Sequence, residues 1–526
     1  MPMAPEDRRG VADAGASETG VNAELRDRLT QSLDALHLDR SPDLTRSKRS
    51  ERRGVEVRDT DLRTPEHSEV LQLAQLLAEG AFTCEELVQD LLDAAGRLSS
   101  LNVYAQRFDD HALACAREAD ALRRAGRTRG ALHGIPVAVK DVLSTREAPT
   151  TANSRVGAAT LPPGDAPVVH RLRAAGAVVL GKTTTMELAC GMPDRDGGEA
   201  VPRNPWEPDH WTGGSSSGSA SGVAARLFPA ALGSDTAGSI RTPAALCGVT
   251  GFKPTHGKVS TAGCLMLSPD MDCVGPIAQT AIDCAVIMEA ILGQAQPRTG
   301  DTVGLVGVRI AAERERYESP DIDPAVRTAF RAAIATFESL GATVDDVTLP
   351  GYEALRVASR VLWTTEAFAT FGAALDTVRP PTRQLLEVGA MHSGADFALA
   401  RRAIAWGQQA MAQALSPYAA VLSPTRTCLA PLLEEATIEW QLSTHNHTSI
   451  WNVLGFPAVS VPMGLSADGL PMGLQIIGAA GADRQTLAIA AHYQSVTEWH
   501  RARPPLAAPI GRHLQRPRGS AQVVAS

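Results

Sequence analysis

The chain has 526 residues, of which 44% are hydrophobic and 21% are charged, as is usual for a soluble globular protein. A net charge of -8 argues against a nucleic-acid-binding surface, because phosphate binding requires clustered Lys and Arg side chains. No apolar run reaches the roughly 20 residues that a helix needs to cross a bilayer, so we expect no association with a membrane.

Residues 1–68 are rich in Arg, Asp, Ser and Glu and poor in aromatic residues, which predicts a mostly disordered N-terminal extension. Within it, Leu25, Leu29, Leu33 and Leu36 recur at helical spacing and predict one short amphipathic helix, through which a homodimer could form. Arg8 and Arg9 precede no apolar segment of the kind that an export signal requires, so we expect a cytoplasmic protein.

Between this extension and a proline-rich C-terminal tail at residues 501–526, helical and strand-like segments alternate. Helical periodicity is predicted over residues 69–98, 111–124 and 168–175, and apolar strands over residues 134–139, 177–180 and 229–233. Near the end, two further strand-like segments, 458–462 and 472–477, flank an Asp468-Gly469 turn and predict a hairpin. The alternation predicts an α/β fold with a mixed, twisted central sheet covered by helices on both faces.

The densest glycine and serine content lies in residues 213–222, Gly-Gly-Ser-Ser-Ser-Gly-Ser-Ala-Ser-Gly, and a second such segment covers residues 233–244. A flexible linker would have this composition, but a linker would not be flanked by apolar sequence as both segments are. Buried turns fit better, because glycine lets the backbone approach closely and leaves N–H groups pointing into a cavity. The two segments therefore predict a site for an anion or an oxyanion.

Residues 213–244 together resemble the full signature of the amidase signature family of serine amide hydrolases. Companion segments resemble the family in the same order. They are residues 132–141 (Leu-His-Gly-Ile-Pro-Val-Ala-Val-Lys-Asp), 181–189, 204–206, 251–255, 272–276, 424–425 and 455–477. The resemblance covers residues 69–498, and it implies one amidase signature domain over residues 69–500.

The resemblance also implies roles by position. Ser239 would be the nucleophile, Ser215 a bridging serine preceded by a cis peptide bond, and Lys140 the base. The backbone amides of Thr236, Ala237, Gly238 and Ser239 would form the oxyanion hole. The side chains of Ser216, Asp235 and Arg241 would hold the loop in place. Leu188, Ala189 and Cys190 would line the substrate site. Ala237 departs from the glycine that many members have there, and its methyl group would narrow the space beside the oxyanion.

These residue types suit amide hydrolysis, which needs an activated nucleophile, charge stabilisation and a proton for the departing amine. A lysine has a pKa near ~10.4 and can act as a base only if burial lowers it. Lys140 ends the apolar strand predicted before it, which is a suitable setting. The expected reaction is hydrolysis of a small-molecule carboxylic amide to an acid and ammonia or an amine through an acyl-serine, with no metal and no organic cofactor.

Two motifs suggest other chemistry. Residues 176–183 match the spacing of a phosphate-binding P-loop, but their apolar middle predicts a strand instead of a loop. Residues 214–218 match the GxSxG elbow of α/β-hydrolases, with Ser216 as nucleophile, but no apolar strand precedes them.

Two alternative functions remain on the same fold. One is the A subunit of a tRNA-dependent amidotransferase complex, and the other is a non-catalytic binding protein. The 8 cysteines form no CxxC pair and are interpreted as reduced thiols. The sequence gives neither the identity of the amide nor the oligomeric state.

Overall fold

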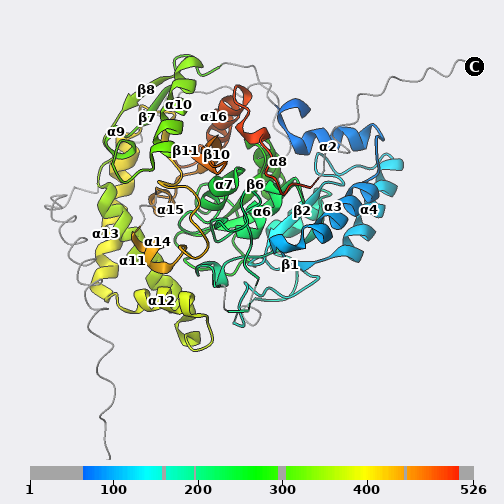
Figure 1. Cartoon of the computed structure of the whole chain (residues 1–526), viewed down its shortest axis with the longest axis horizontal. Helices are drawn as coiled ribbons and strands as arrows, with labels where there is room; N and C mark the ends of the chain where they lie inside the picture. Colours follow the sequence, from blue (N-terminus) through cyan, green and yellow to red (C-terminus); the bar gives the residue numbers. More distant parts are fainter. Residues whose placement is uncertain are drawn as a thin grey trace, which may run out of the picture.

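The computed structural model describes residues 63–156, 161–194, 197–198, 200–293, 304–443 and 447–508. Its centre is a single sheet of 11 strands (Figure 1). From one edge to the other the strands are β1 (Tyr104–Arg107), β3 (Val178–Thr183), β2 (Pro136–Lys140), β4 (Ala230–Asp235), β6 (Cys273–Ala278), β5 (Thr250–Lys253), β10 (Ala458–Leu465), β11 (Pro471–Ile477), β9 (Ala420–Pro424), β7 (Arg309–Ala312) and β8 (Thr343–Asp346).

The sheet is mixed, as predicted. Strands β3, β2 and β4 run parallel, as do β9, β7 and β8, while β6, β5, β10 and β11 pair in antiparallel fashion between these two groups. The predicted hairpin is confirmed as β10 and β11 around the Asp468-Gly469 turn, where Gly469 has a φ of 80°. Every residue of β2, β3 and β4 is buried, which agrees with the uninterrupted apolar runs typical of parallel strands.

Helices surround the sheet. In chain order they are α2 (Glu69–Ala78), α3 (Cys84–Arg97), α4 (Asp109–Arg124), α5 (Pro167–Ala174), α6 (Ser217–Ala224), α7 (Arg241–Cys247), α8 (Ala281–Leu292), α9 (Arg314–Tyr317), α10 (Pro324–Ser339), α11 (Tyr352–Phe371), α12 (Pro380–Ala390), α13 (Gly394–Ala414), α14 (Ile438–Ser443), α15 (Ser449–Val453) and α16 (Asp483–Ser495).

Adjacent residues of β5 show that both faces of the sheet are covered. A Cβ on Gly251 would lie 2.7 Å from Ala244 Cβ of α7, while the hydroxyl of Thr250 accepts a hydrogen bond from Gln494 of α16. Successive residues of a strand point to opposite faces, so α7 and α16 lie on opposite sides of the sheet. The predicted α/β class with helices on both faces is confirmed.

The helical periodicity over residues 69–98 corresponds to two helices instead of one. The first, α2, ends before Gly80, whose φ is 70°. The second, α3, has Thr83 as its N-cap. The Thr83 hydroxyl accepts from the N–H of Glu86, and the Glu86 carboxylate accepts from the N–H of Thr83. This capping box fixes a new helix start that hydrophobic periodicity alone does not reveal.

Packed contacts extend slightly beyond residues 69–500. Arg63 forms an ion pair of 2.7 Å with Glu289 of α8, and the N–H of Ala508 donates to Ala225 O. The helix predicted around residues 25–36, and the dimer inferred from it, lie outside the described residues. No helix within the described ranges is both long and apolar enough to cross a bilayer.

Candidate active site

Lys140 ends β2 and is completely buried. Its Nζ donates to Ser215 Oγ at 2.7 Å and to Ser234 Oγ at 2.8 Å. Burial lowers the pKa of Lys140 from 10.5 to about 7, although the nearby Cys264, Asp235 and Asp272 act in the opposite direction. A large fraction of this amine is therefore neutral near pH 7 and able to accept a proton.

Ser234 is a contact of the lysine that the sequence analysis did not identify. Strands β2 and β4 are parallel, and Val139 pairs with Leu232. Lys140 and Ser234 follow this pair, so they come together at the carboxyl ends of the two strands. Ser216 holds Ser234 in turn, since its hydroxyl donates to Ser234 O at 3.1 Å and accepts from Ser234 N at 3.3 Å. The sequence signal for this contact was the hydroxyl-bearing residue Ser234 near the end of the neighbouring strand β4.

The first glycine- and serine-rich segment forms a buried turn at residues 213–216, and its remaining residues belong to α6. The peptide bond between Gly214 and Ser215 is cis, as the family resemblance implied. Ser215 O accepts hydrogen bonds from Thr185 Oγ1 at 2.8 Å and from Met186 N at 3.3 Å. The N–H of Ser216 donates to Ser239 O at 3.0 Å, which ties the two segments together.

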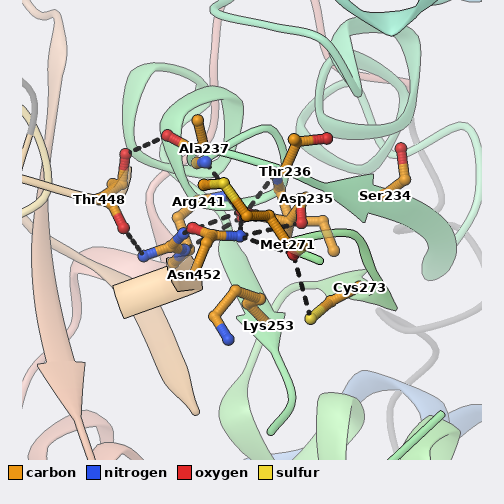
Figure 2. Close-up of polar contacts among 12 residues, drawn as sticks. Ser234, Asp235, Thr236, Ala237, Arg241, Lys253, Met271, Cys273, Thr448 and Asn452 are labelled. Atoms are coloured by element: carbon orange, nitrogen blue, oxygen red, sulfur yellow. Dashed lines mark hydrogen bonds and ion pairs between the residues drawn. The ribbon is translucent and has the colours of Figure 1, made fainter. Parts of the chain in front are cut away.

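Asp235 holds the second glycine- and serine-rich segment, residues 233–244, in place through hydrogen bonds (Figure 2). Its carboxylate accepts from the N–H groups of Gly238 at 2.8 Å and Ile240 at 3.0 Å. The guanidinium of Arg241 donates to it twice, at 3.0 Å and 2.9 Å, and both side chains are fully buried. Burial alone would raise the pKa of Asp235, but Arg241 and Asn452 outweigh it and hold the pKa well below its usual range.

Residues from the far end of the chain complete this support. Asn452 Nδ2, in α15, donates to Asp235 O at 2.9 Å and Oδ1 at 2.8 Å, and Thr448 Oγ1 donates to Ala237 O at 2.6 Å (Figure 2). Arg241 also donates to Thr448 O at 3.0 Å and to Gln475 Oε1 at 2.6 Å. These partners lie more than 200 residues away in the chain, so no local sequence pattern could identify them.

A second buried carboxylate, Asp272, lies close to the same turn. It accepts from the hydroxyl of Thr236 and from the backbone N–H groups of Leu267 at 2.7 Å and Ser268 at 3.0 Å. Burial raises the pKa of Asp272 to about 6 despite these donors. It is a further acidic neighbour of Lys140 that the sequence analysis did not assign.

The two segments border a cavity. Its volume, including the space at its open mouth, is about 930 Å³. The residues that line it are Ala189, Cys190, Gly191, Met192, Trp211, Gly214, Ser215, Thr236, Ala237, Gly238, Ser239, Thr242, Leu267, Arg356, Arg360, Trp363, Leu385, Arg426, Trp440, Gln441 and Ser449.

The cavity therefore brings together most of the residues that the resemblance singled out. Ser215 and Ser239 both line it, as do residues 236–238 and two of the three substrate-lining candidates, Ala189 and Cys190. The third, Leu188, is fully buried in a short 3-10 helix (Glu187–Ala189) and is not among the lining residues. Lys140 lies behind the lining and reaches it through Ser215.

The backbone amides expected to form the oxyanion hole differ in their surroundings. The N–H of Gly238 donates to Asp235, so it is already engaged. Gly238 has a φ of 121°, and a Cβ there would lie 2.1 Å from Thr448 Oγ1, so the turn requires glycine at this position.

Neither of the two alternative motifs has the geometry that its chemistry needs. Residues 178–183 form β3, and Lys182 Nζ lies 2.8 Å from Asp141 Oδ1, fully buried, instead of in a phosphate-binding loop. Ser216 is also completely buried with its hydroxyl engaged, and the segment before it forms isolated bridges instead of a strand. Among the described residues no group of three His, Cys, Asp or Glu side chains could hold a metal ion.

Comparisons with known proteins agree with this geometry. A family model described as Amidase matches residues 86–487. The chain is 35% identical over 488 residues to the A subunit of the glutamyl-tRNA(Gln) amidotransferase of Chloroflexus aurantiacus, covering 84% of this chain and 99% of that one.

Two solved structures share the fold. A crystal structure of an amidase has a TM-score of 0.74 and 30% identity and covers 81% of this chain and 99% of that one. The native peptide amidase of Stenotrophomonas maltophilia has a TM-score of 0.70 and 29% identity, covering 84% of this chain and 98% of that one. The chain therefore belongs to the amidase signature family.

Proposed function

We propose that this protein hydrolyses a carboxylic amide through an acyl-enzyme on Ser239, with Ser215 and Lys140 completing the triad. The observation that carries the proposal is the position of Lys140. It is a fully buried lysine whose Nζ lies 2.7 Å from the hydroxyl of Ser215, and Ser215 and Ser239 line the same cavity. A buried lysine with a pKa near 7 suits a general base at neutral pH.

The proposed first step transfers one proton along the triad. Neutral Lys140 takes the proton of the Ser215 hydroxyl, and Ser215 takes that of Ser239 as Ser239 Oγ forms a bond to the amide carbon. A neutral amine has two N–H groups and one lone pair. Donation of one N–H to Ser234 leaves the lone pair available to the Ser215 hydroxyl.

The carbonyl oxygen then carries negative charge, which backbone N–H groups of residues 236–239 would stabilise. Because the N–H of Gly238 already donates to Asp235, we assign the larger share to its neighbours in the turn. Collapse of the tetrahedral intermediate breaks the C–N bond, and the proton returns through Ser215 to the leaving nitrogen. Water then attacks the acyl-Ser239 ester, and the reverse proton transfers release the acid.

A fluorophosphonate serine probe followed by intact-mass spectrometry and peptide mapping tests this assignment. We expect one adduct on Ser239, absent from Ser239→Ala and strongly reduced in Lys140→Ala, with the exposed Ser260→Ala as a control that labels normally. An adduct on Ser216 would instead support the α/β-hydrolase elbow. Folded protein without any adduct or amide hydrolysis would contradict the assignment; it would favour a non-catalytic binding protein if partner proteins also fail to restore activity.

The second candidate is the A subunit of a tRNA-dependent amidotransferase. It is favoured by the relatives that carry the name of the A subunit of glutamyl-tRNA(Gln) amidotransferase, which the chain matches over 99% of their length at 35% and 36% identity. The two candidates differ in what the isolated chain can do. Steady hydrolysis of small amides by the chain alone supports the amidase, whereas activity that appears only with partner proteins supports the second candidate.

A further inference from the structure

The lining of the cavity carries positive charge. Three arginines contribute to it, Arg356, Arg360 and Arg426, and none of the described lining residues is Asp or Glu. Arg356 and Arg360 lie one helical turn apart on α11, and Arg356 Nε donates to Glu353 at 2.8 Å. The cavity therefore combines the two serines of the proposed reaction with positively charged side chains.

Arg426 is the most informative of the three. It follows β9, is only 6% exposed, and its Nε and Nη2 are buried with no hydrogen-bond partner among the described residues. Its guanidinium lies 5.3 Å from the ring centroid of Trp440, a contact that orients the cation but does not neutralise it. A buried cation without a counter-ion is unfavourable, so an anion at this position would be strongly attracted.

A second unpartnered donor lies in the same cluster. Trp211 is 4% exposed, lines the cavity, and its Nε1 has no hydrogen-bond partner within the described part of the chain. Its ring packs edge to face against Trp440, with centroids 5.6 Å apart. Arg426 and Trp211 both contact Trp440 and offer only N–H donors there, so a ligand that meets them must supply acceptors.

One lining acceptor also lacks a partner. The Oε1 of Gln441, next to Trp440, is buried without a hydrogen bond among the described residues. An amide N–H on the same ligand would satisfy it. The unpartnered groups therefore match a molecule that carries both an anionic oxygen pair and an amide.

We propose that the natural substrate is an amide that also bears a carboxylate, bound with that carboxylate at Arg426 and Trp211. The inference rests on the proposed function, because it places this anion in the cavity that Ser239 lines. Nε and Nη2 share one edge of a guanidinium, so after a rotation toward the cavity a single carboxylate would accept from both. Because no lining residue in the described part of the chain is acidic, these residues supply no counter-ion for an ammonium group, which disfavours a zwitterionic amide such as free glutamine.

Matched substrates test the proposal. Succinamate, glutaramate and adipamate carry the carboxylate on the acyl side, and their neutral counterparts are butanamide, pentanamide and hexanamide. N-Acetylglycine carries it on the amine side, and its neutral counterpart is N-methylacetamide. We expect kcat/KM to favour at least one carboxylate-bearing amide over its counterpart by about 10- to 100-fold, the range of a charge-assisted hydrogen bond. Glutamine should react more slowly than glutaramate. A ratio near 1 for every pair would overturn the proposal.

Variants then assign the effect to Arg426. In Arg426→Gln the ratio of kcat/KM for the preferred anionic amide to that for its counterpart should fall by about 10- to 100-fold. Arg426→Lys, which keeps the charge, should lie between that variant and wild type. Arg402→Gln, on the exposed face of α13, is the matched control and should keep the wild-type ratio. An unchanged ratio in well-folded Arg426→Gln contradicts the proposal.

A binding measurement separates this inference from the proposed function. Glutarate, which cannot be hydrolysed, should raise the melting temperature of wild type and slow probe labelling of Ser239, and both effects should be lost in Arg426→Gln. If Ser239 reacts with the probe but glutarate does neither, the carboxylate site is wrong and the hydrolase proposal stands. If glutarate binds through Arg426 but no amide is cleaved and Ser239 is not labelled, the hydrolase proposal is wrong.

Discussion

Replacing Lys140 by methionine should abolish activity and yet stabilise the protein. The unfolded chain holds this amine protonated at pH 7, whereas burial lowers its pKa from 10.5 to about 7 in the folded state. At 1.36 kcal/mol for each pKa unit, and with the folded amine half protonated, burial costs about 4 kcal/mol of stability at pH 7. The hydrogen bonds to Ser215 and Ser234 offset about 1 kcal/mol each. Lys140→Met should therefore be about 2 kcal/mol more stable at pH 7.

The effect also has a defined dependence on pH. Between the folded-state pKa near 7 and the unfolded-state value of 10.5, the unfolded chain binds a proton that the folded chain has released. The free energy of unfolding of wild type therefore rises with pH across this window, and this gain is lost again as pH falls toward 7. At pH 9 the penalty is only about 2 kcal/mol, which the hydrogen bonds nearly balance.

Urea unfolding of wild type and Lys140→Met at pH 7 and pH 9, with amide hydrolysis measured in parallel, checks this reasoning. We expect a loss of about 10³-fold or more in kcat/KM, as for removal of a general base. We also expect a stability gain at pH 7 that shrinks at pH 9. A variant that is several kcal/mol less stable at pH 7, or a stability difference that does not change with pH, would refute the description of Lys140 as a buried base with a lowered pKa.

Four further outcomes follow from the same contacts. Wild-type kcat/KM should increase as pH rises through about 7, because Lys140 must lose its proton to act, and a profile flat from pH 5 to 9 would contradict this role. Ser234→Ala should move that midpoint downward, because Ser234 accepts from the charged amine, whereas Ser219→Ala, which removes a buried donor to Leu232 O, should not. Gly238→Ala should reduce kcat by about 100-fold, because the added methyl group would displace the turn. Gly257→Ala is the control, since Gly257 also has a positive φ but lies in open space, and it should keep the wild-type kcat. Equal kcat values for the two variants would exclude a requirement for glycine at position 238. Arg241→Met should lose about 3–5 kcal/mol in urea unfolding by leaving the Asp235 carboxylate unpaired, whereas Arg331→Met, which removes an exposed pair, should change the stability far less.

The sequence predicted those features that depend on local patterns. The apolar runs before Lys140 and Asp235 correspond to β2 and β4, and the Asp468-Gly469 turn to the hairpin of β10 and β11. Glycine- and serine-rich composition between apolar flanks correctly indicated buried turns at one cavity, because turn chemistry is encoded locally.

What the sequence did not predict depends on contacts between distant segments. Thr448 and Asn452 support the serine turn from more than 200 residues away, and Arg426 reaches the cavity from a strand end in the opposite half of the sheet. Ser234 could have been anticipated, because parallel neighbours bring their carboxyl ends together, but the strand order needed for that step became known only from the fold.

The central claim is that Ser239 becomes acylated during turnover, and acid-quenched mass spectrometry tests it most directly. Wild type mixed with an excess of a reactive amide or its hydroxamate, quenched within one turnover and digested, should carry the acyl mass on the peptide that contains Ser239. Ser239→Ala should carry none. An acyl mass on any other residue, or turnover with no covalent adduct under conditions where acylation outpaces deacylation, would contradict the account.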